Sequence, residues 1–180
     1  MFDQNQLTGT IPDSIGQFTN LVILNMHENQ LTGSIPAAIG GLTKLLQINF
    51  FNNSLNGSIP TEIGNCHALT IFTVGYNKLT GSIPAELGSL PFLFYLEVQN
   101  NQLSGEVAPS ISSLSVLKSI DISNNKFSGD PTVALVPLTQ LTELSLGNND
   151  FQIADLEGLL QNFTKLMVLD ISHFGLSMVP

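Results

Sequence analysis

The sequence has no arginine, no tryptophan and a single cysteine among its 180 residues. Charged residues make up only 11% of the chain, and five lysines against fourteen acids give a formal net charge of −9. Because binding to a nucleic-acid backbone needs clustered lysine and arginine, this composition excludes nucleic acid as the expected partner. The one cysteine, Cys66, also excludes a disulfide within the chain.

Signals for membrane insertion, export, metals and cofactors are missing as well. No apolar run reaches the roughly 18 to 20 residues of a membrane span. The first residues, MFDQNQLTG, lack the basic region and the following apolar stretch of a secretory signal. The histidines, His27, His67 and His173, lie in distant parts of the sequence without ligand spacing, so we expect neither a metal nor a cofactor. Hydrophobic residues make up 43% of the chain, which predicts a folded protein.

What the sequence does contain is one pattern, LxxLxLxxNxLxGxIPxxIGxLxx, that recurs about every 24 residues. Its leading leucine falls at Leu21, Leu45, Leu69, Leu93, Leu117, Leu141 and Leu166. A partial copy occupies residues 1–20, so Met1 lies inside a repeat, as expected of a piece of a longer protein. A fixed period of this length predicts a solenoid, in which each unit packs only against its neighbours. We therefore expect residues 1–180 to form one repeat domain that works through an open face.

The first half of each repeat predicts a short strand followed by a bend. Leu24 and Met26 occupy alternate positions, which is typical of a strand with one buried face. Stacked strands of this kind must be parallel, because each is reached through a complete coil. An asparagine follows in each unit, where its amide is expected to satisfy backbone groups at the bend. These residues are Asn5, Asn29, Asn53, Asn77, Asn101, Asn125 and Asn149, and Phe174 takes the slot in the last unit.

The second half of each repeat predicts a turn and a compact helical segment. The glycine of the L-T/S-G-x-I-P stretch suits a special backbone dihedral, and the proline favours a turn. The following xxIGxLxx segment predicts one helical turn, of the tighter 3-10 kind. From Gly129 onward the pattern relaxes, and residues Asp155 to Phe163 predict a fuller helix on the convex side. Cys66 stands where other repeats have leucine, so we expect a small buried hydrophobe.

These leucine, asparagine, glycine and Ile-Pro slots recur together in register, and the sequence therefore resembles the plant-specific class of leucine-rich repeats over essentially all 180 residues. The resemblance implies an α/β repeat solenoid, a right-handed curved superhelix with a concave parallel β-sheet. The convex side would carry short 3-10, helical or second-sheet segments. Ectodomains of this class usually carry caps with paired cysteines. This chain shows neither such caps nor a kinase or transmembrane segment.

The same resemblance implies a function. Members are extracellular parts of plant receptor-like kinases and receptor-like proteins, which act in signalling and defence, and they recognise peptides, steroids or proteins without catalysis. A co-receptor along the flank of the solenoid would be a second partner. The alternative is a secreted inhibitor or scaffold of the polygalacturonase-inhibitor type. Several peptide-sensing members hold a ligand carboxylate with an R-x-R pair, which the lack of arginine excludes here.

The outward strand positions predict a binding site. The apolar residues Phe51, Ile71, Tyr76 and Tyr95 fall on neighbouring coils, and the acidic residues Glu97, Asp121 and Glu143 follow beside them. Exposed aromatic side chains can anchor a partner with little loss of entropy. We therefore expect a peptide or protein ligand with an apolar anchor and a basic flank. The competing interpretation is that isolated exposed aromatics are ordinary surface.

Three sequons, beginning at Asn52, Asn56 and Asn162, permit N-glycosylation of an exported chain. A glycan on Asn52 would stand beside Phe51 and obstruct the expected site. Its presence would move the contact surface toward Tyr95 or toward the flank.

Two other functions compete with recognition. Glu97 and Asp121 share a column on adjacent strands, about 5 Å apart, which is the carboxylate spacing of retaining glycosidases. Nothing in the sequence predicts an enclosing cleft or a nucleophile with its base, so we do not expect an enzyme. An ice-binding ladder is the second alternative, since hydroxyl or amide side chains recur one repeat apart at Thr8, Thr32, Asn56, Thr80, Ser104 and Ser128. Local bonding of serine and threonine to the backbone explains that column more simply.

Overall fold

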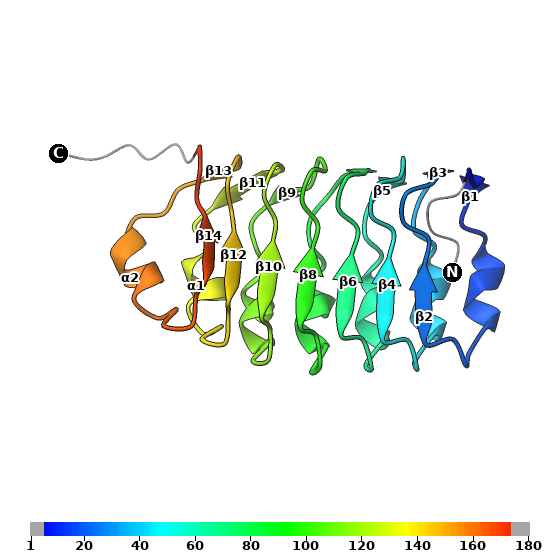
Figure 1. Cartoon of the computed structure of the whole chain (residues 1–180), viewed down its shortest axis with the longest axis horizontal. Helices are drawn as coiled ribbons and strands as arrows, with labels where there is room; N and C mark the ends of the chain where they lie inside the picture. Colours follow the sequence, from blue (N-terminus) through cyan, green and yellow to red (C-terminus); the bar gives the residue numbers. More distant parts are fainter. Residues whose placement is uncertain (1–5, 174–180) are drawn as a thin grey trace.

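The computed structural model describes residues 6–173 as a stack of similar coils (Figure 1). Seven parallel strands, one from each coil, form a continuous sheet along one face. These strands are β2 (Ile23–Asn25), β4 (Gln47–Asn49), β6 (Ile71–Thr73), β8 (Tyr95–Glu97), β10 (Ser119–Asp121), β12 (Glu143–Ser145) and β14 (Val168–Asp170). The predicted leucine-rich-repeat solenoid with a concave parallel sheet is therefore confirmed. The assignment of all 180 residues to one domain stays a prediction.

Every residue of this sheet pairs with the equivalent residue of the next coil. Ile71 stands opposite Tyr95, and Glu97 stands opposite Asp121. The columns of outward side chains expected from the 24-residue period are thus real columns on the concave face. No helix within residues 6–173 is long and apolar enough to span a membrane.

Beyond the bend, short strands form three small sheets at the edge of the solenoid. They are β1 (Thr8–Thr10) with β3 (Gln30–Thr32), β5 (Asn56–Gly57) with β7 (Lys78–Leu79), and β9 (Ser104–Gly105), β11 (Lys126–Gly129) and β13 (Asp150–Phe151). This confirms the second-sheet segments that the resemblance implied.

The register of these edge strands differs from that of the concave sheet. Thr32 pairs with Thr10 rather than with Thr8. The cause is Asn29, which directly precedes Gln30, the partner of Thr8. Asn29 Oδ1 accepts a hydrogen bond from the backbone N–H of Leu7 and so sets the pairing of the residues that follow. Thr8 and Thr32 are therefore not paired across neighbouring strands, and the prediction of a flat hydroxyl ladder that joins them at strand spacing is wrong.

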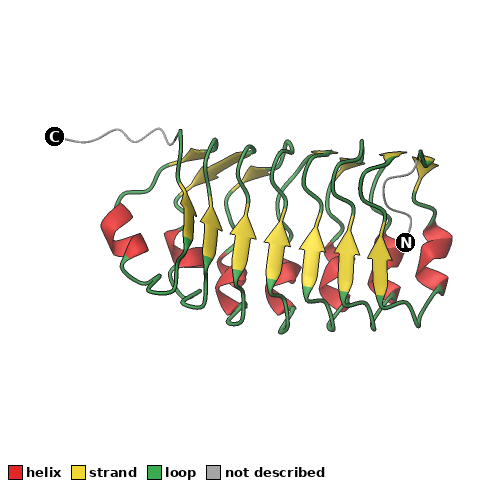
Figure 2. Cartoon of the chain, viewed as in Figure 1, coloured by secondary structure: helices red, strands yellow, loops and turns green. Residues whose placement is uncertain are grey.

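The convex side carries the predicted short helical segments, which lie behind the sheet in Figure 2. Five are 3-10 turns: η1 (Asp13–Gln17), η2 (Ala37–Gly41), η3 (Thr61–Asn65), η4 (Ala85–Ser89) and η5 (Pro109–Ser113). The last two are α-helices, α1 (Thr132–Leu135) and α2 (Leu156–Leu160). The fuller helix expected between Asp155 and Phe163 is thus present but shorter, and Asp155 caps it by accepting from the N–H of Gly158 at 2.8 Å.

The core runs the length of the stack between the sheet and the helical segments. The leading leucines Leu45, Leu69 and Leu93 are fully buried, and so is Cys66. Burial raises the pKa of the Cys66 thiol to about 11, and its Sγ donates to the carbonyl of Ile39. The expectation of a small buried hydrophobe is confirmed, and the raised pKa disfavours the reactive thiolate.

The asparagines form a ladder at the bend. Asn77 is representative: its Oδ1 accepts from the N–H of Leu55 at 2.9 Å, and its Nδ2 donates to the carbonyls of Phe50 at 3.0 Å and Val74 at 3.1 Å. Each amide therefore ties its own coil to the preceding one and satisfies backbone groups that the bend exposes. Equivalent bonds occur at Asn53, Asn101, Asn125 and Asn149. Asn5 and Phe174 lie outside the described residues.

Candidate functional site

Two aromatic rings meet on the concave face just beyond the strands. The ring centroids of Phe51 and Tyr76 are 4.9 Å apart with an interplanar angle of 57°. Phe51 is half-buried, whereas 49% of Tyr76 is exposed. Tilted pairs at this separation are favourable beyond the burial of their area. Phe51 therefore supports the ring of Tyr76 and leaves one side of it open to solvent.

The backbone of Tyr76 is strained. Its φ is +55°, in the left-handed region that asparagine tolerates far better than an aromatic residue does. The same slot holds asparagine in four other coils, at Asn52, Asn100, Asn124 and Asn148, and Glu28 and His173 in two more, all with similar φ. Strain of this kind is retained where the side chain has a use. Sequence reasoning missed it, although the run of asparagines in this slot was the available signal.

Ile71 and Tyr95 form a second apolar pair, opposite each other on β6 and β8. Ile71 is half-buried and Tyr95 is exposed. Gly75 stands in the same column as Phe51, and Ile71 lies four residues before Gly75 on the same coil. Four residues of extended chain cover about 13 Å, so Ile71 and Phe51 are separated by about that distance along the coil. The four apolar residues thus form two separate pairs at opposite margins of the concave face.

The three carboxylates lie between and beside these pairs. Glu97 Oε2 accepts from the hydroxyl of Thr73 at 3.4 Å, and Glu143 Oε2 accepts from that of Ser119 at 3.1 Å. Burial raises the pKa of Glu97, and the neighbouring charges of Asp121 and Glu143 raise it further. Burial likewise raises the pKa of Asp121. No cation within the described part of the chain lowers the pKa of either group.

Asp121 has a structural task that Glu97 lacks. Asp121 Oδ1 accepts from the N–H of Ser123 at 3.0 Å. In an equivalent turn, Asn49 Oδ1 accepts from the N–H of Phe51 at 3.1 Å. Such local bonds stabilise a turn two residues on. In the coils that begin at Leu69 and Leu93, Thr73 and Glu97 occupy this column instead. The Glu97 carboxylate is therefore not committed to the backbone of its own coil.

Gly75 and Gln99 add a further irregularity to these two coils. A side chain at Gly75 would collide with the amide of Gln99, whose Oε1 would lie 2.6 Å from the added carbon. Gln99 therefore lies across Gly75. Its Oε1 is buried without a hydrogen-bond partner among the described residues. An unsatisfied buried acceptor is rare in a native structure, and it places another departure from the repeat pattern beside Tyr76.

The three sequon asparagines differ in accessibility. Asn52 and Asn56 are exposed, whereas Asn162 is half-buried and its Nδ2 donates to the carbonyl of Gly158 at 2.8 Å. Glycosylation at all three stays a prediction. Asn52 directly follows Phe51, so a glycan there would stand beside the aromatic pair.

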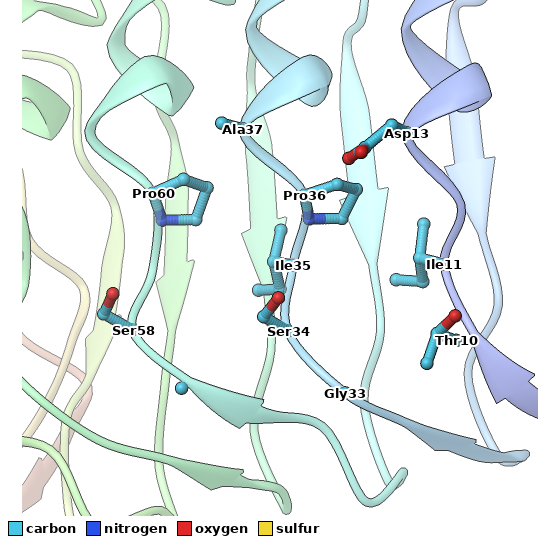
Figure 3. A pocket seen from close by; sticks show the side chains of 11 residues that line it. Thr10, Ile11, Asp13, Gly33, Ser34, Ile35, Pro36, Ala37, Ser58 and Pro60 are labelled. Carbon is cyan, nitrogen blue, oxygen red and sulfur yellow. The ribbon is translucent and has the colours of Figure 1, made fainter.

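The flank of the solenoid carries a shallow depression between the edge strands and the helical segments (Figure 3). Ser34, Pro36, Ser58 and Pro60 line it, with Asp13 at one end. Within residues 6–173 no group of three or more histidine, cysteine or acidic side chains is arranged to hold a metal. The depression offers a contact surface lined by small and apolar side chains with one carboxylate.

Replacing Glu97 by glutamine is expected to raise the Tm at pH 7. Since burial raises the folded-state pKa of Glu97 above its unfolded value, the charged carboxylate destabilises the fold at neutral pH. This penalty is lost as the pH falls through the raised value toward 4.5, the ordinary pKa of glutamate. Thermal unfolding of both proteins across this range should therefore show a difference that shrinks on acidification. Glu86→Gln, on the exposed turn η4, is the control, and an equal effect there would contradict the prediction.

The comparisons with known proteins agree with this architecture. The sequence profile described as Leucine Rich Repeat matches residues 20–42, 44–66 and 116–138. No curated protein sequence matches the chain.

Among solved structures, the chain is similar to the plant peptide hormone receptor RGFR1 in complex with RGF2. The TM-score is 0.89 at 34% identity, over 95% of this chain and 27% of that one. It is also similar to the ectodomain of the Arabidopsis receptor kinase HAESA in complex with an IDA peptide hormone, with a TM-score of 0.85 at 32% identity, over 94% of this chain and 28% of that one. A structure of HAESA with IDA and the co-receptor SERK1 matches with a TM-score of 0.69 at 28% identity, over 96% of this chain and 33% of that one. The chain thus spans about a third or less of the receptor chains it matches.

Proposed function

Because the chain is a leucine-rich-repeat solenoid of the kind that forms plant receptor ectodomains, we propose that it is a non-catalytic module that recognises a peptide or protein on its concave face. Its place would be at the cell surface, on the extracellular side, in a receptor for signalling or defence. The solved relatives bound to RGF2 and IDA support a peptide as the ligand class.

The observation that carries the proposal is the concentration of irregular features on two adjacent coils. Three features lie between Leu69 and Leu117: the strained Tyr76, the Gln99 Oε1 without a partner among the described residues, and the Glu97 carboxylate, which accepts from Thr73 of the preceding coil rather than from its own backbone. In the coils on either side, asparagine or aspartate occupies the slots of Glu97 and Tyr76, and Asn49 and Asp121 accept from the backbone of their own coil. Departures from local rules are expected where a protein trades stability for function.

The chemistry of these coils indicates the features of the ligand. The exposed rings of Tyr76 and Tyr95 offer apolar contact at the two margins. Tyr76 lies five residues beyond Ile71, the partner of Tyr95, which is about 16 Å along the chain direction. Glu97 and Asp121 lie between them as acceptors whose pKa values are raised by burial, and a cation placed there would lower both. A segment that carries an apolar residue followed by lysine or arginine fits this arrangement.

Selection from a random peptide library tests the proposal. The bait is the whole chain, and the counter-selection uses the variant in which Tyr76 and Tyr95 are both alanine. We expect peptides that combine an apolar residue with a basic one, and we expect the double variant to bind them at least about tenfold more weakly. Peptides that bind both proteins equally would overturn the concave site. Circular dichroism of the variant checks that its fold is retained.

A second partner is proposed for the flank. HAESA binds the co-receptor SERK1 together with IDA, which supports a protein partner beside a bound peptide. In this chain the depression lined by Ser34, Pro36 and Ser58 is the surface we assign to it (Figure 3). A secreted inhibitor or scaffold of the polygalacturonase-inhibitor type is the alternative function, and it would use the same solenoid surfaces without a peptide.

A further inference from the structure

Asn56 is the one asparagine of the sequence that is followed directly by glycine. In the other coils with a glycine in this slot, the preceding residue carries a hydroxyl, at Thr8, Thr32, Thr80, Ser104 and Ser128. The coil that begins at Leu45 therefore has a side-chain amide where its neighbours have a hydroxyl. Asn56 belongs to the edge strand β5 beyond the bend, so the concave face makes no use of this amide.

The amide of Asn56 differs in accessibility from the amides of the asparagine ladder. Nδ2 of Asn53, three residues earlier, donates to the carbonyls of Met26 at 3.0 Å and of Phe50 at 3.1 Å. These bonds fix the orientation of the Asn53 amide. Asn56, in contrast, is exposed, and the terminal torsion of an exposed asparagine is broad. The Asn56 side chain is therefore free to turn its carbonyl carbon toward the backbone.

The backbone at Asn56 is held by a short pairing. β5 consists of Asn56 and Gly57, and it pairs with β7 in a sheet of two strands. The N–H of Asn56 donates to the carbonyl of Gly33 at 2.9 Å, and the carbonyl of Gly57 accepts from the N–H of Thr80 at 2.8 Å. A short element at an exposed edge opens locally at a small cost in free energy. Such an opening lets the backbone nitrogen of Gly57 reach the side chain of Asn56.

Gly57 is also the residue type that hinders this approach least. Its φ is +71°, in the region that glycine adopts readily, and it has no side chain beside its nitrogen. An exposed amide, a flexible backbone and an unhindered nitrogen thus occur together at one peptide bond.

We propose that Asn56 is a site of spontaneous covalent modification, at which its side-chain amide is converted to a carboxylate through a cyclic imide. The nitrogen of Gly57 loses its proton and attacks Cγ of Asn56, so that a new C–N bond forms. The bond from Cγ to the amide nitrogen then breaks, and this nitrogen leaves with the proton as ammonia. Water opens the imide at either of its two carbonyls. The products are aspartate or isoaspartate, in which the main chain runs through the former side chain.

The two products affect the edge sheet differently. Asn56 stands opposite Lys78 in the parallel pairing, so an aspartate at position 56 places opposite charges across the two strands, which is favourable. Isoaspartate inserts an additional methylene into the main chain of β5. The bonds to Gly33 and Thr80, which lie on either side of this insertion, then no longer fit one register. Isoaspartate is therefore the product that weakens the edge sheet.

The modification also changes the flank of the solenoid. Gly57 and Ser58, the two residues that follow Asn56, line the depression on this flank (Figure 3). Either product adds a negative charge beside them. The reaction itself depends only on Asn56 and Gly57 and is independent of the ligand proposed for the concave face.

Incubation of the whole folded chain at mildly alkaline pH, followed by peptide mapping with mass spectrometry, tests the proposal. The chain is produced without glycosylation, so that the amide of Asn56 is free. We expect the carboxylate to accumulate at position 56 at least several-fold faster than at Asn52, which is also exposed but is followed by asparagine. The rate should increase with pH, because the attacking nitrogen must lose its proton. A rate no higher than that of Asn52 overturns the proposal, and so does reaction only in urea, where the chain is unfolded.

The products identify the route. Passage through the imide yields both isoaspartate and aspartate, whereas direct hydrolysis of the amide yields aspartate alone. Detection of isoaspartate at position 56 is therefore the expected result, and aspartate without isoaspartate overturns the imide route. Once separated, the isoaspartate form should have a lower Tm than the Asn56→Asp variant, and equal values would contradict the effect on the edge sheet.

Asn56→Thr is the matched control, because Thr32 and Thr80 occupy the same slot in the neighbouring coils. We expect this variant to keep the circular dichroism spectrum of the unmodified chain and to acquire no carboxylate at position 56. Accumulation of the same modified peptide in this variant would place the reaction at another residue and overturn the assignment.

Discussion

Replacing Asn77 by alanine is expected to lower the free energy of unfolding by about 3 kcal/mol, because it orphans several buried backbone groups at once. The N–H of Leu55 loses its acceptor, and the carbonyls of Phe50 and Val74 lose a donor. Each unsatisfied buried group costs about 1–3 kcal/mol, and water can reach only part of this bend. The substitution therefore costs more than the loss of an average side chain.

The position of Asn77 in the middle of the stack adds a second expectation. A solenoid is held together by contacts between neighbouring coils, so weakening one junction uncouples the two halves. Urea unfolding followed by circular dichroism should show a lower midpoint and a broader transition. Asn65→Ala, at the exposed end of η3, is the matched control and should change the unfolding free energy by less than about 0.5 kcal/mol. Equal effects at the two positions would contradict a structural role for the ladder.

The concave face could be predicted from the sequence because its geometry follows from two periods. The 24-residue repeat brings equivalent residues together, and the two-residue alternation decides which side chains face outward. Glu97 and Asp121 were therefore placed opposite each other correctly. The separation of Ile71 from Phe51 follows from the same spacing, since four extended residues cover about 13 Å. Grouping the four apolar residues by their expected exposure alone predicts a single cluster instead.

The register of the edge strands could not be predicted in the same way. It depends on a hydrogen bond in three dimensions, from the N–H of Leu7 to the side chain of Asn29, which shifts the pairing by two residues. No periodicity in the sequence encodes that shift. The helix α2 illustrates a related limit. The absence of the Ile-Pro pair indicates a helix in this coil, but it does not fix the ends of that helix, which begins directly after its N-cap residue Asp155.

The structural role of Asp121 was hidden for a different reason. Its position beside two other acids predicts a role in ligand binding. Its carboxylate also accepts from the N–H of Ser123 and fixes the turn there, as Asn49 does with the N–H of Phe51. The sequence contained the signal, since asparagine or aspartate occupies this column in four coils, at Asn25, Asn49, Asp121 and Asp170. Glu97 is therefore the more informative acid for binding, because the backbone of its coil makes no use of it.

Tyr76→Asn is expected to abolish most ligand binding while leaving the fold about as stable as before. Asparagine accepts a φ of +55° more readily than tyrosine does, which gains about 1 kcal/mol. The lost contact with Phe51 costs about 0.5–1.5 kcal/mol and offsets that gain. Binding of a peptide selected against the whole chain should weaken by about tenfold to a hundredfold, because an exposed anchoring ring is removed. Isothermal titration and urea unfolding of the same preparation measure the two quantities.

Two further variants separate the ring from the backbone. Tyr76→Phe keeps the ring at the same φ and should retain most of the binding. Asn100→Tyr forces a tyrosine into the equivalent slot of the next coil, where φ is also +55°, and should cost about 1 kcal/mol of stability without improving binding. If Tyr76→Asn instead destabilises the chain by several kcal/mol and binds the peptide normally, the ring serves packing alone. Loss of binding in Tyr76→Asn at unchanged stability, with binding retained in Tyr76→Phe, would show that the ring is kept for its contact with a ligand.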